Sequence, residues 1–273
     1  MVWSCLVSIL PGMAQTEKLT DYVNPFVGTD GYGNVYPGAQ IPFGGIQISP
    51  DTDSRFYDAA SGYKYNHLTL MGFSLTHLSG TGIPDLGDFL FIPGTGEMKL
   101  EPGTHEDPDQ GYRSRYSHDK EWASPNYYAV ELADYGVKAE MTSGVRSGMF
   151  RFTYPESDNA FIMIDMNHTL WQSCEWANLR MENDSTITGY KLVKGWGPER
   201  HVYFAAVFSR KLTGLRFMQD KKPVIYNTSR FRSDREAWGK NLMACLSFAT
   251  GEGEEVIVKT AISSVSTSGA KMN

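Results

Sequence analysis

Residues 73–88 read Phe-Ser-Leu-Thr-His-Leu-Ser-Gly-Thr-Gly-Ile-Pro-Asp-Leu-Gly-Asp and run directly into the apolar segment Phe-Leu-Phe-Ile-Pro at residues 89–93. The stretch opens with apolar and polar residues in alternation, which is the pattern of a short half-buried strand. Gly80, Gly82 and Gly87 then allow backbone turns that other residues resist. Hydroxyl, imidazole and carboxylate side chains crowd the positions between these glycines. A polar, glycine-rich loop between two strands is typical of a binding site.

Strand-like segments of similar length recur along the rest of the chain. Most of them alternate apolar and polar residues, and Gly, Pro, Asp or Asn bound them, so they favour an antiparallel sheet. They are residues 22–27, 42–50, 127–132, 137–141, 148–154, 160–166, 175–182, 186–194, 201–208, 240–250 and 255–264. Only residues 234–242 carry a helix-like pattern. The chain is therefore predicted to be all-β, a large antiparallel β-sandwich with few short helices.

The totals limit the kind of partner. A length of 273 residues suits one large sandwich domain. The formal charge of −6 comes without a basic patch, which argues against a nucleic-acid partner. The aromatic content of 13% suits a neutral polar ligand such as a sugar. No apolar run approaches the roughly 18 residues of a membrane helix, so no membrane span is expected.

The first residues look like a targeting segment. An apolar run at residues 2–10 is followed by small residues, although the usual positive start is absent. We expect residues 1–20 to be a truncated secretory signal or leader, which implies a secreted or periplasmic protein. Cys5, Cys174 and Cys245 lack metal-ligand spacing. A disulfide between Cys174 and Cys245 stays open at this stage.

The loop at residues 73–88 carries a close pair of carboxylates, Asp85 and Asp88. Sugar hydrolysis needs two carboxylates that flank the glycosidic bond. However, a spacing of three residues across Gly87 favours turn formation and local capping. His77 has no serine or cysteine nucleophile in an elbow context, so a hydrogen-bonding role is the better interpretation. We therefore assign no catalytic residue and no metal ligand within this chain.

Aromatic residues stand in two loop-like places. Residues 55–65 hold four aromatic side chains beside one carboxylate and two cations, a combination that favours an aromatic core strand over a sugar platform. Trp196 lies between Gly195 and Gly197, and both a sugar-stacking platform and a plug on the sandwich end stay open. His105 and His118 occur in polar sequence, and we expect them to be solvated.

Together these pieces resemble glycoside hydrolase family 92, the calcium-dependent, exo-acting α-mannosidases found largely in gut Bacteroidetes and other bacteria. The run Thr-His-Leu-Ser-Gly-Thr-Gly at residues 76–82, with its trailing aspartates, is the most specific match. The other matching segments are residues 23–30, 36–39, 42–44, 49–51, 61–63, 72–74, 195–196, 202–204, 208–209, 265–266 and 269–270, with Ala206 and Asn273.

The resemblance implies a two-part enzyme. Residues 21–265 would form an N-terminal sandwich of the galactose-mutarotase-like supersandwich type, and residues 266–273 would start a linker to an (α/α)6-barrel catalytic domain. The resemblance places the general acid, the general base and the main calcium ligands in that barrel. The full enzyme would invert the anomeric centre while it releases terminal α-mannose from N-glycans or mannans. This chain alone is expected to be inactive.

The resemblance also implies substrate contacts with a terminal mannose. The matching positions are Gly28, Thr29, Asp58, His77 and Trp196. Residues 31–34 and 57–60 depart from the family patterns Gly-His-Gly-His and Trp-Asp-Trp-Cys, so the linkage preference can differ from the α-1,2 type. The alternative function is a stand-alone, lectin-like carbohydrate-binding module without hydrolase activity.

Overall fold

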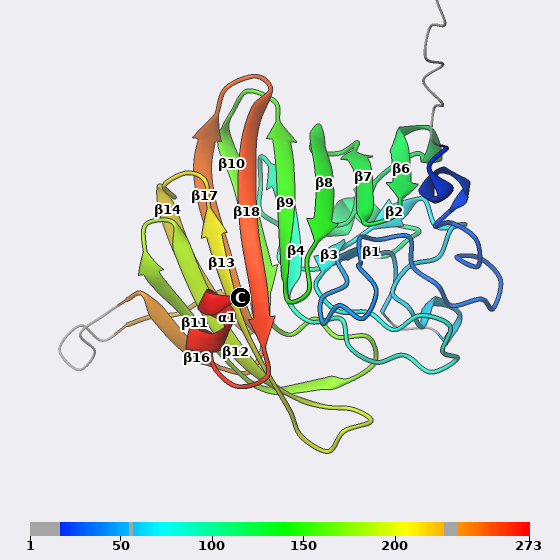
Figure 1. Cartoon of the computed structure of the whole chain (residues 1–273). Helices are drawn as coiled ribbons and strands as arrows, with labels where there is room; N and C mark the ends of the chain where they lie inside the picture. Colours follow the sequence, from blue (N-terminus) through cyan, green and yellow to red (C-terminus); the bar gives the residue numbers. More distant parts are fainter. Residues whose placement is uncertain (1–16, 55–56, 227–233) are drawn as a thin grey trace, which may run out of the picture.

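Two antiparallel β-sheets stack face to face in the computed structural model, which describes residues 17–54, 57–226 and 234–273 (Figure 1). The seven-stranded sheet has the order β1 (Ser49–Asp51), β3 (Gly72–Ser74), β4 (Leu90–Thr95), β10 (Ser157–Asp165), β17 (Leu242–Thr250), β14 (Gly214–Gln219) and β15 (Lys222–Pro223). The nine-stranded sheet has the order β16 (Glu236–Gly239), β11 (Ser173–Asn183), β12 (Thr186–Lys194), β13 (Arg200–Phe208), β18 (Glu254–Ser263), β9 (Ser147–Tyr154), β8 (Val137–Ser143), β7 (Tyr127–Leu132) and β6 (Glu121–Ser124).

The remaining elements are short. β2 (Thr69–Leu70) and β5 (Ser114–Arg115) form a two-stranded sheet. The 3-10 helices are η1 (Leu19–Tyr22), η2 (Tyr57–Ala59), η3 (Pro108–Gln110) and η4 (His118–Lys120), and α1 (Thr267–Met272) is the α-helix of the described residues. The prediction of an all-β antiparallel sandwich with few short helices is confirmed.

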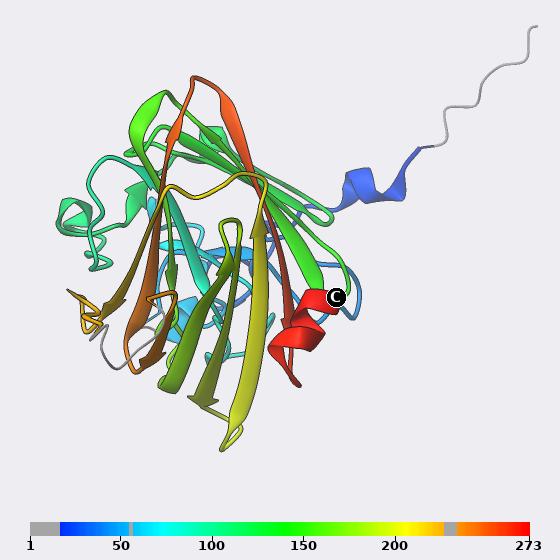
Figure 2. The ribbon, with the colours of Figure 1, turned by 90° about the vertical axis from the view of Figure 1, so that its left-hand side faces the viewer.

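Aromatic side chains fill the space between the two sheets. Each strand sends alternate side chains to one face, so Phe150 and Phe152 of β9 point inward while Met149 is exposed. The ring of Phe91 on β4 lies 5.1 Å from that of Phe150 and 6.4 Å from that of Phe204 on β13. Contacts between these rings connect the seven-stranded sheet to the nine-stranded sheet. Figure 2 shows the two sheets as layers of the ribbon.

A second, smaller core covers the other face of the seven-stranded sheet. Leu90, Phe161 and Met243 lie on this face, and Tyr112 packs against them from the segment that follows β4. Because β4, β10 and β17 are buried on both faces, their sequences read as apolar runs more than as alternation.

Helix α1 packs on the outer face of the nine-stranded sheet, against β13 and β18 (Figure 2). Its N-cap residue Ser266 accepts a hydrogen bond from the backbone N–H of Gly269 at 3.0 Å, and Ala270 is buried. Residues 266–273, expected to begin a linker, thus form a helix that docks on the sandwich.

Three local predictions are wrong. Residues 22–27 form turns in place of a strand, because the Asn24 side chain accepts the N–H of Phe26. Of residues 42–50, only the end belongs to β1, since Phe43 at φ 59° breaks the extended run. Residues 234–242 contain strand β16 in place of a helix, because this segment pairs with β11 at the edge of the sheet.

Cys174 and Cys245 do not form a disulfide in the described residues. Cys174 on β11 and Cys245 on β17 are both buried and both free. Cys5, and most of the leader expected at residues 1–20, lie outside the described residues. No helix of the described part combines the length and the apolar character that a membrane crossing requires.

Candidate functional site

Five separate parts of the chain meet beside β1 and β3, and we call this assembly the loop cluster. It comprises residues 28–34, 62–65, 76–88, 168–172 and 195–200, together with Asp51 of β1 and Lys191 of β12, which are buried beneath these loops. Backbone hydrogen bonds join the parts: the N–H of Tyr65 donates to the carbonyl of Thr29 (3.0 Å), and that of Gly80 donates to Asn34 (2.7 Å). The N–H of Leu170 donates to the carbonyl of Leu86 (2.9 Å). The blue and cyan loops at the right of Figure 1 belong to this region.

Gly28 and Thr29 form a tight turn in the loop cluster. Gly28 adopts φ +85°, a conformation that favours glycine, and its carbonyl accepts the N–H of Val35. Thr29 is buried, and its hydroxyl donates to the carbonyl of Phe26 at 2.8 Å. These contacts fix the backbone path of the turn, and they occupy the donor of the Thr29 side chain.

His77 is buried beneath the loop cluster. Its Nδ1 lies 2.8 Å from the carbonyl oxygen of Gln47, and its Nε2 lies 2.8 Å from Oδ1 of Asp51. Both neighbours are acceptors, and together they hold the His77 ring at both of its nitrogens. The second oxygen of Asp51 lies 2.8 Å from Nε2 of His168. One buried carboxylate therefore holds two histidines from distant parts of the chain.

The charge state of Asp51 follows from its partners. Burial of Asp51 by itself raises its pKa, but the charges and hydrogen bonds of His77 and His168 outweigh burial and hold the pKa well below its usual range. Gly62 makes this arrangement fit, because a Cβ atom there would lie 2.0 Å from Oδ1 of Asp51.

Asp88 organises a second buried network. Its carboxylate lies 3.1 Å from Nζ of Lys191 and 2.6 Å from the Arg200 guanidinium, and it accepts the hydroxyl proton of Thr76 at 2.7 Å. Burial again raises the pKa, and the two cations lower it to well below its usual range. Nζ of Lys191 also donates to the carbonyl of His168 at 2.7 Å. The two networks therefore meet at His168.

Trp196 lies at the tip of the β12–β13 hairpin, where 59% of it is exposed. Its backbone N–H faces Oδ2 of Asp85 at 3.4 Å, and Oδ1 of Asp85 accepts the N–H of Leu86 at 2.6 Å. Asp85 thus caps loop amides as the spacing predicted. Asp88 accepts a hydroxyl, that of Thr76, which was the other expected role, but it does not cap a turn, because it is also the centre of an ion-pair network.

The segment around Asp58 is not a strand. Asp58 lies in η2, and its side chain is outside the described residues. Tyr63 is buried and donates to Glu121 at 2.9 Å, whereas Tyr57 is exposed and its ring lies 5.8 Å from that of Trp171. The expected aromatic core strand is therefore wrong: part of this segment is buried, and part lies at the surface.

His105 and His118 are not simply solvated. Nε2 of His105 lies 3.3 Å from Asp53, and Nδ1 of His118 lies 2.6 Å from Glu121. Each ring is mostly buried against its carboxylate. The expectation of solvated rings is wrong, because both polar segments fold back onto the sandwich.

His168, Lys191 and Arg200 were not predicted from the sequence as members of the site. The burial of Lys191 could have been predicted from its position in the strand pattern. Lys191 lies on the inward face of β12, the same face as Ile187 and Val193, and its side chain is 0% exposed. A lysine on the inward face of a strand requires a buried carboxylate partner. The identity of that partner depends on the fold.

Known proteins resemble this chain over nearly its whole length. The solved family GH92 α-mannosidase BT3965 from Bacteroides thetaiotaomicron is 93% identical, with a TM-score of 0.92 over 94% of this chain and 35% of that one. A second structure of the same enzyme contains mannoimidazole. The GH92 glycosyl hydrolase ccman5 is 26% identical, with a TM-score of 0.77 over 93% of this chain and 33% of that chain.

A curated relative from Arthroderma benhamiae, described as an uncharacterized secreted glycosidase, is 30% identical over 139 residues, which are 50% of this chain and 17% of that protein. The chain thus spans about one third of the length of its solved relatives and less of the curated one. The model of the glycosyl hydrolase family 92 N-terminal domain matches residues 22–263. With its sandwich and loop cluster, the chain belongs to glycoside hydrolase family 92 and corresponds to the N-terminal domain of that family.

Proposed function

We propose that this chain is the substrate-facing N-terminal domain of an exported, exo-acting, inverting α-mannosidase, and that its loop cluster contacts the terminal mannose of N-glycans or mannans. The observation that carries the proposal is the loop cluster itself, which presents Trp196 at the surface of a region organised by two buried networks, one around Asp51 and one around Asp88. The 93% identity to a GH92 α-mannosidase supports the choice of sugar.

The buried carboxylates of the loop cluster support binding more than catalysis. Asp51 is held by two histidines, Asp88 by two cations, and Asp85 by two backbone amides. A general acid must hold a proton at neutral pH, and a general base must be free to take one from water. Because Asp51 and Asp88 have lowered pKa values and occupied oxygens, we propose that both catalytic groups come from outside this chain.

Calcium does not fit the described residues. A calcium ion takes six to eight oxygen ligands, including several carboxylates. The part of the chain that the structure describes holds no group of three or more metal-binding side chains, and the oxygens of Asp51 and Asp88 already lie within 3.1 Å of histidine, lysine or arginine nitrogens. We therefore derive no step through calcium, and its ligands would lie in a C-terminal catalytic domain of the same polypeptide.

The proposed contacts divide into two kinds. Trp196 offers an exposed ring on which a pyranose can stack, and Gly28 and Thr29 offer a fixed backbone turn. Asp58 stays in the proposal through its position in η2 next to exposed Tyr57. His77 has no exposed ring atom, so we assign it a positioning role through Asp51.

Export is part of the proposal. The two cysteines of the described residues are free, so no disulfide among those residues indicates the redox compartment of the protein. The support is the secreted relative and the apolar run at residues 2–10. N-terminal sequencing of protein recovered from the periplasm or medium should find a start near residue 15 to 20, whereas an intact Met1 would contradict export through a cleaved signal.

A calorimetric titration with methyl α-D-mannopyranoside tests the binding role, and a release assay on 4-nitrophenyl α-mannoside with calcium tests the catalytic one. We expect weak binding and no release by the 273-residue chain. Trp196→Ala should remove the share of the binding that depends on the Trp196 ring, whereas Trp238→Ala, which removes an equally exposed indole from β16, should leave the binding unchanged. Calcium-dependent release by this chain would refute the assignment of acid and base.

The reading frame downstream of Asn273 separates the enzyme from the lectin-like alternative. Several hundred further residues with a helical-barrel pattern, and mannose release by the longer product, would support the enzyme. A stop codon together with mannoside binding would support the stand-alone binding module.

A further inference from the structure

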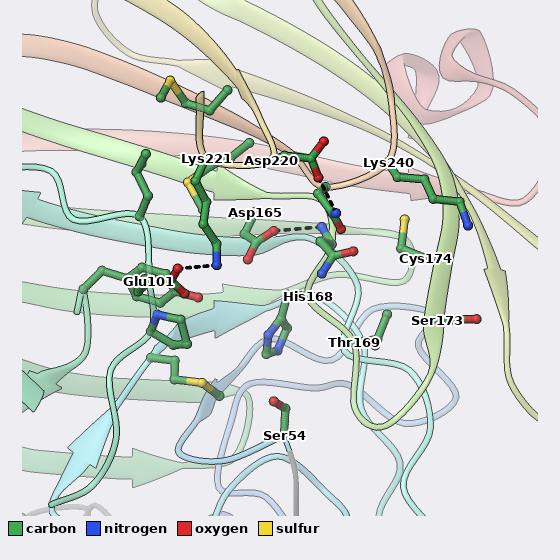
Figure 3. A pocket seen from close by; sticks show the side chains of 18 of the residues that line it. Ser54, Glu101, Asp165, His168, Thr169, Ser173, Cys174, Asp220, Lys221 and Lys240 are labelled. Atoms are coloured by element: carbon green, nitrogen blue, oxygen red, sulfur yellow. Dashed lines mark hydrogen bonds and ion pairs between the residues drawn. The ribbon is translucent and has the colours of Figure 1, made fainter. Parts of the chain in front are cut away.

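A cavity of about 760 Å³ lies between the end of β10 and the segment that follows β4, and residues 168–172 of the loop cluster contribute to its wall. Figure 3 shows Ser54, Asp165, His168 and the Lys221–Glu101 pair around it. Sites for small ligands have volumes of 300 to 1,000 Å³, and they combine apolar walls with a few placed polar groups. Met71, Leu100 and Met243 supply the apolar wall here.

Two polar groups of the cavity are held in fixed positions by the fold. His168 lies on the cavity wall, and its Nε2 is fixed by Asp51 at 2.8 Å, so Nδ1 is its remaining polar atom. The Asp165 carboxyl is held by the backbone N–H of Asn167 at 2.8 Å. Burial raises the pKa of Asp165, although His168 and the backbone amides oppose the rise. Such fixed groups can orient the hydroxyls of a ligand without first reorganising.

The charges around the cavity favour a neutral ligand. Lys221 pairs with Glu101, Lys240 pairs with Glu175 at 3.1 Å, and Asp220 accepts from the side-chain amide of Asn241 at 2.6 Å. Both lysines are thus already matched by carboxylates, and Asp165 and Asp220 leave the lining slightly acidic. A neutral polyhydroxylated molecule suits this lining better than a phosphate. The described residues hold no group of three or more metal-binding side chains here.

Trp171 at the cavity wall is held in a costly conformation. It adopts φ +68°, which is a rare region for a bulky residue, and 57% of it is exposed. Neighbouring contacts enforce this geometry, because the Thr169 hydroxyl donates to the carbonyl of Gln172 at 2.9 Å and the N–H of Leu170 donates to Leu86. Backbone strain around an exposed aromatic ring is a feature of ligand sites.

We infer that this cavity is a second saccharide site, in which a hexopyranose ring stacks on Trp171 while His168 and Asp165 receive or donate hydrogen bonds to its hydroxyls. The choice of an α-mannoside as the probe rests on the proposed function. The site itself is distinct from Trp196, which does not line the cavity.

The test is a calorimetric titration of the 273-residue chain with methyl α-D-mannopyranoside, followed for five variants, of which Trp196→Ala removes the ring invoked in the proposed function. Trp171→Gly should weaken binding to the cavity about tenfold or more, and it should leave thermal stability equal or higher, because glycine adopts φ +68° without strain. Trp171→Phe should recover part of the affinity. His168→Asn should weaken binding as well. Trp238→Ala, matched in exposure at 58%, should change nothing.

The outcomes separate this site from the proposed function. Binding that survives Trp196→Ala and is lost in Trp171→Gly supports the second site. Binding lost in Trp196→Ala and unchanged in Trp171→Gly overturns it and leaves the proposed function intact. A flat titration of the unmodified chain also overturns it, and equal losses in Trp171→Gly and Trp238→Ala would do the same.

Discussion

The two sheets and the loop cluster are stabilised by different interactions. In the sheets, apolar alternation fills the core, and the ion pair of Arg151 on β9 with Glu140 on β8 keeps one partner in solvent, since 43% of the Arg151 side chain is exposed although Glu140 is buried. In the loop cluster, Asp51, Asp88 and Lys191 are fully buried, and each depends on partners from distant segments. A surface pair can be lost at little cost, whereas a buried charge without its partner is expensive. The loop cluster should therefore be the more sensitive region to single substitutions.

Asp88→Asn should have the largest effect. It leaves Lys191 buried without a counter-ion, and breaking a buried ion pair in this way costs about 3–5 kcal/mol. Urea unfolding followed by tryptophan fluorescence measures the change in the free energy of unfolding. The double variant Asp88→Asn with Lys191→Met is the control, because it removes the stranded charge. It should be more stable than Asp88→Asn alone, and a double variant less stable than the single one would contradict the role of the ion pair.

Gly62→Ala should come next. A Cβ atom at residue 62 would lie 2.0 Å from Oδ1 of Asp51, so the Asp51 pairing with His77 and His168 must break or shift. We expect a loss of about 2–4 kcal/mol in the free energy of unfolding. Gly80→Ala is the matched control: it has a similar φ of +75° but open space around its Cβ, so only the left-handed backbone cost of about 1 kcal/mol applies. Equal losses in thermal denaturation would show that crowding of Asp51 does not matter.

The same contrast explains what the sequence could predict. Strands 127–132 and 186–194 were predicted with their observed bounds, because alternation and turn residues are local signals. Residues 234–242 were assigned wrongly, since pairing with β11 overrides a weak local helical pattern. Local patterns therefore determine most of the sandwich.

The loop cluster needed information that no local pattern holds. His77 and Trp196 stood out by residue type, but the partners of His77 are Gln47, Asp51 and, through Asp51, His168. The last of these is 91 positions away along the chain, and nothing near residue 77 specifies it. The roles that the family resemblance implies for Gly28, Thr29, Asp58, His77 and Trp196 stay predictions.

Acid should weaken the loop cluster before it weakens the sheets. Asp51 and Asp88 have lowered pKa values in the folded state, so their contribution to stability is complete above the unfolded value of about 3.9 and is lost as pH falls below it. Each carboxyl contributes a slope of up to about 1.4 kcal/mol per pH unit. Hydrogen exchange between pH 4 and pH 2 should show loss of protection at Leu170 and Gly80 before β9. Simultaneous loss would argue against a separate loop unit.

Arg151→Met should have the smallest effect on the free energy of unfolding. It tests whether a partly exposed ion pair of the sheets contributes less than the buried pairs of the loop cluster. The hydrogen bond from Arg151 lowers the pKa of Glu140 to about 2, yet 43% of the Arg151 side chain is exposed, so solvent screens the pair. Lys138 also lies 3.3 Å from Glu140 and keeps it partly paired after the substitution. We expect a loss of about 0.2–1 kcal/mol in urea unfolding, and a smaller one in 1 M salt. A loss as large as that of Asp88→Asn would mean that partner exposure does not set the energetic difference between the two regions.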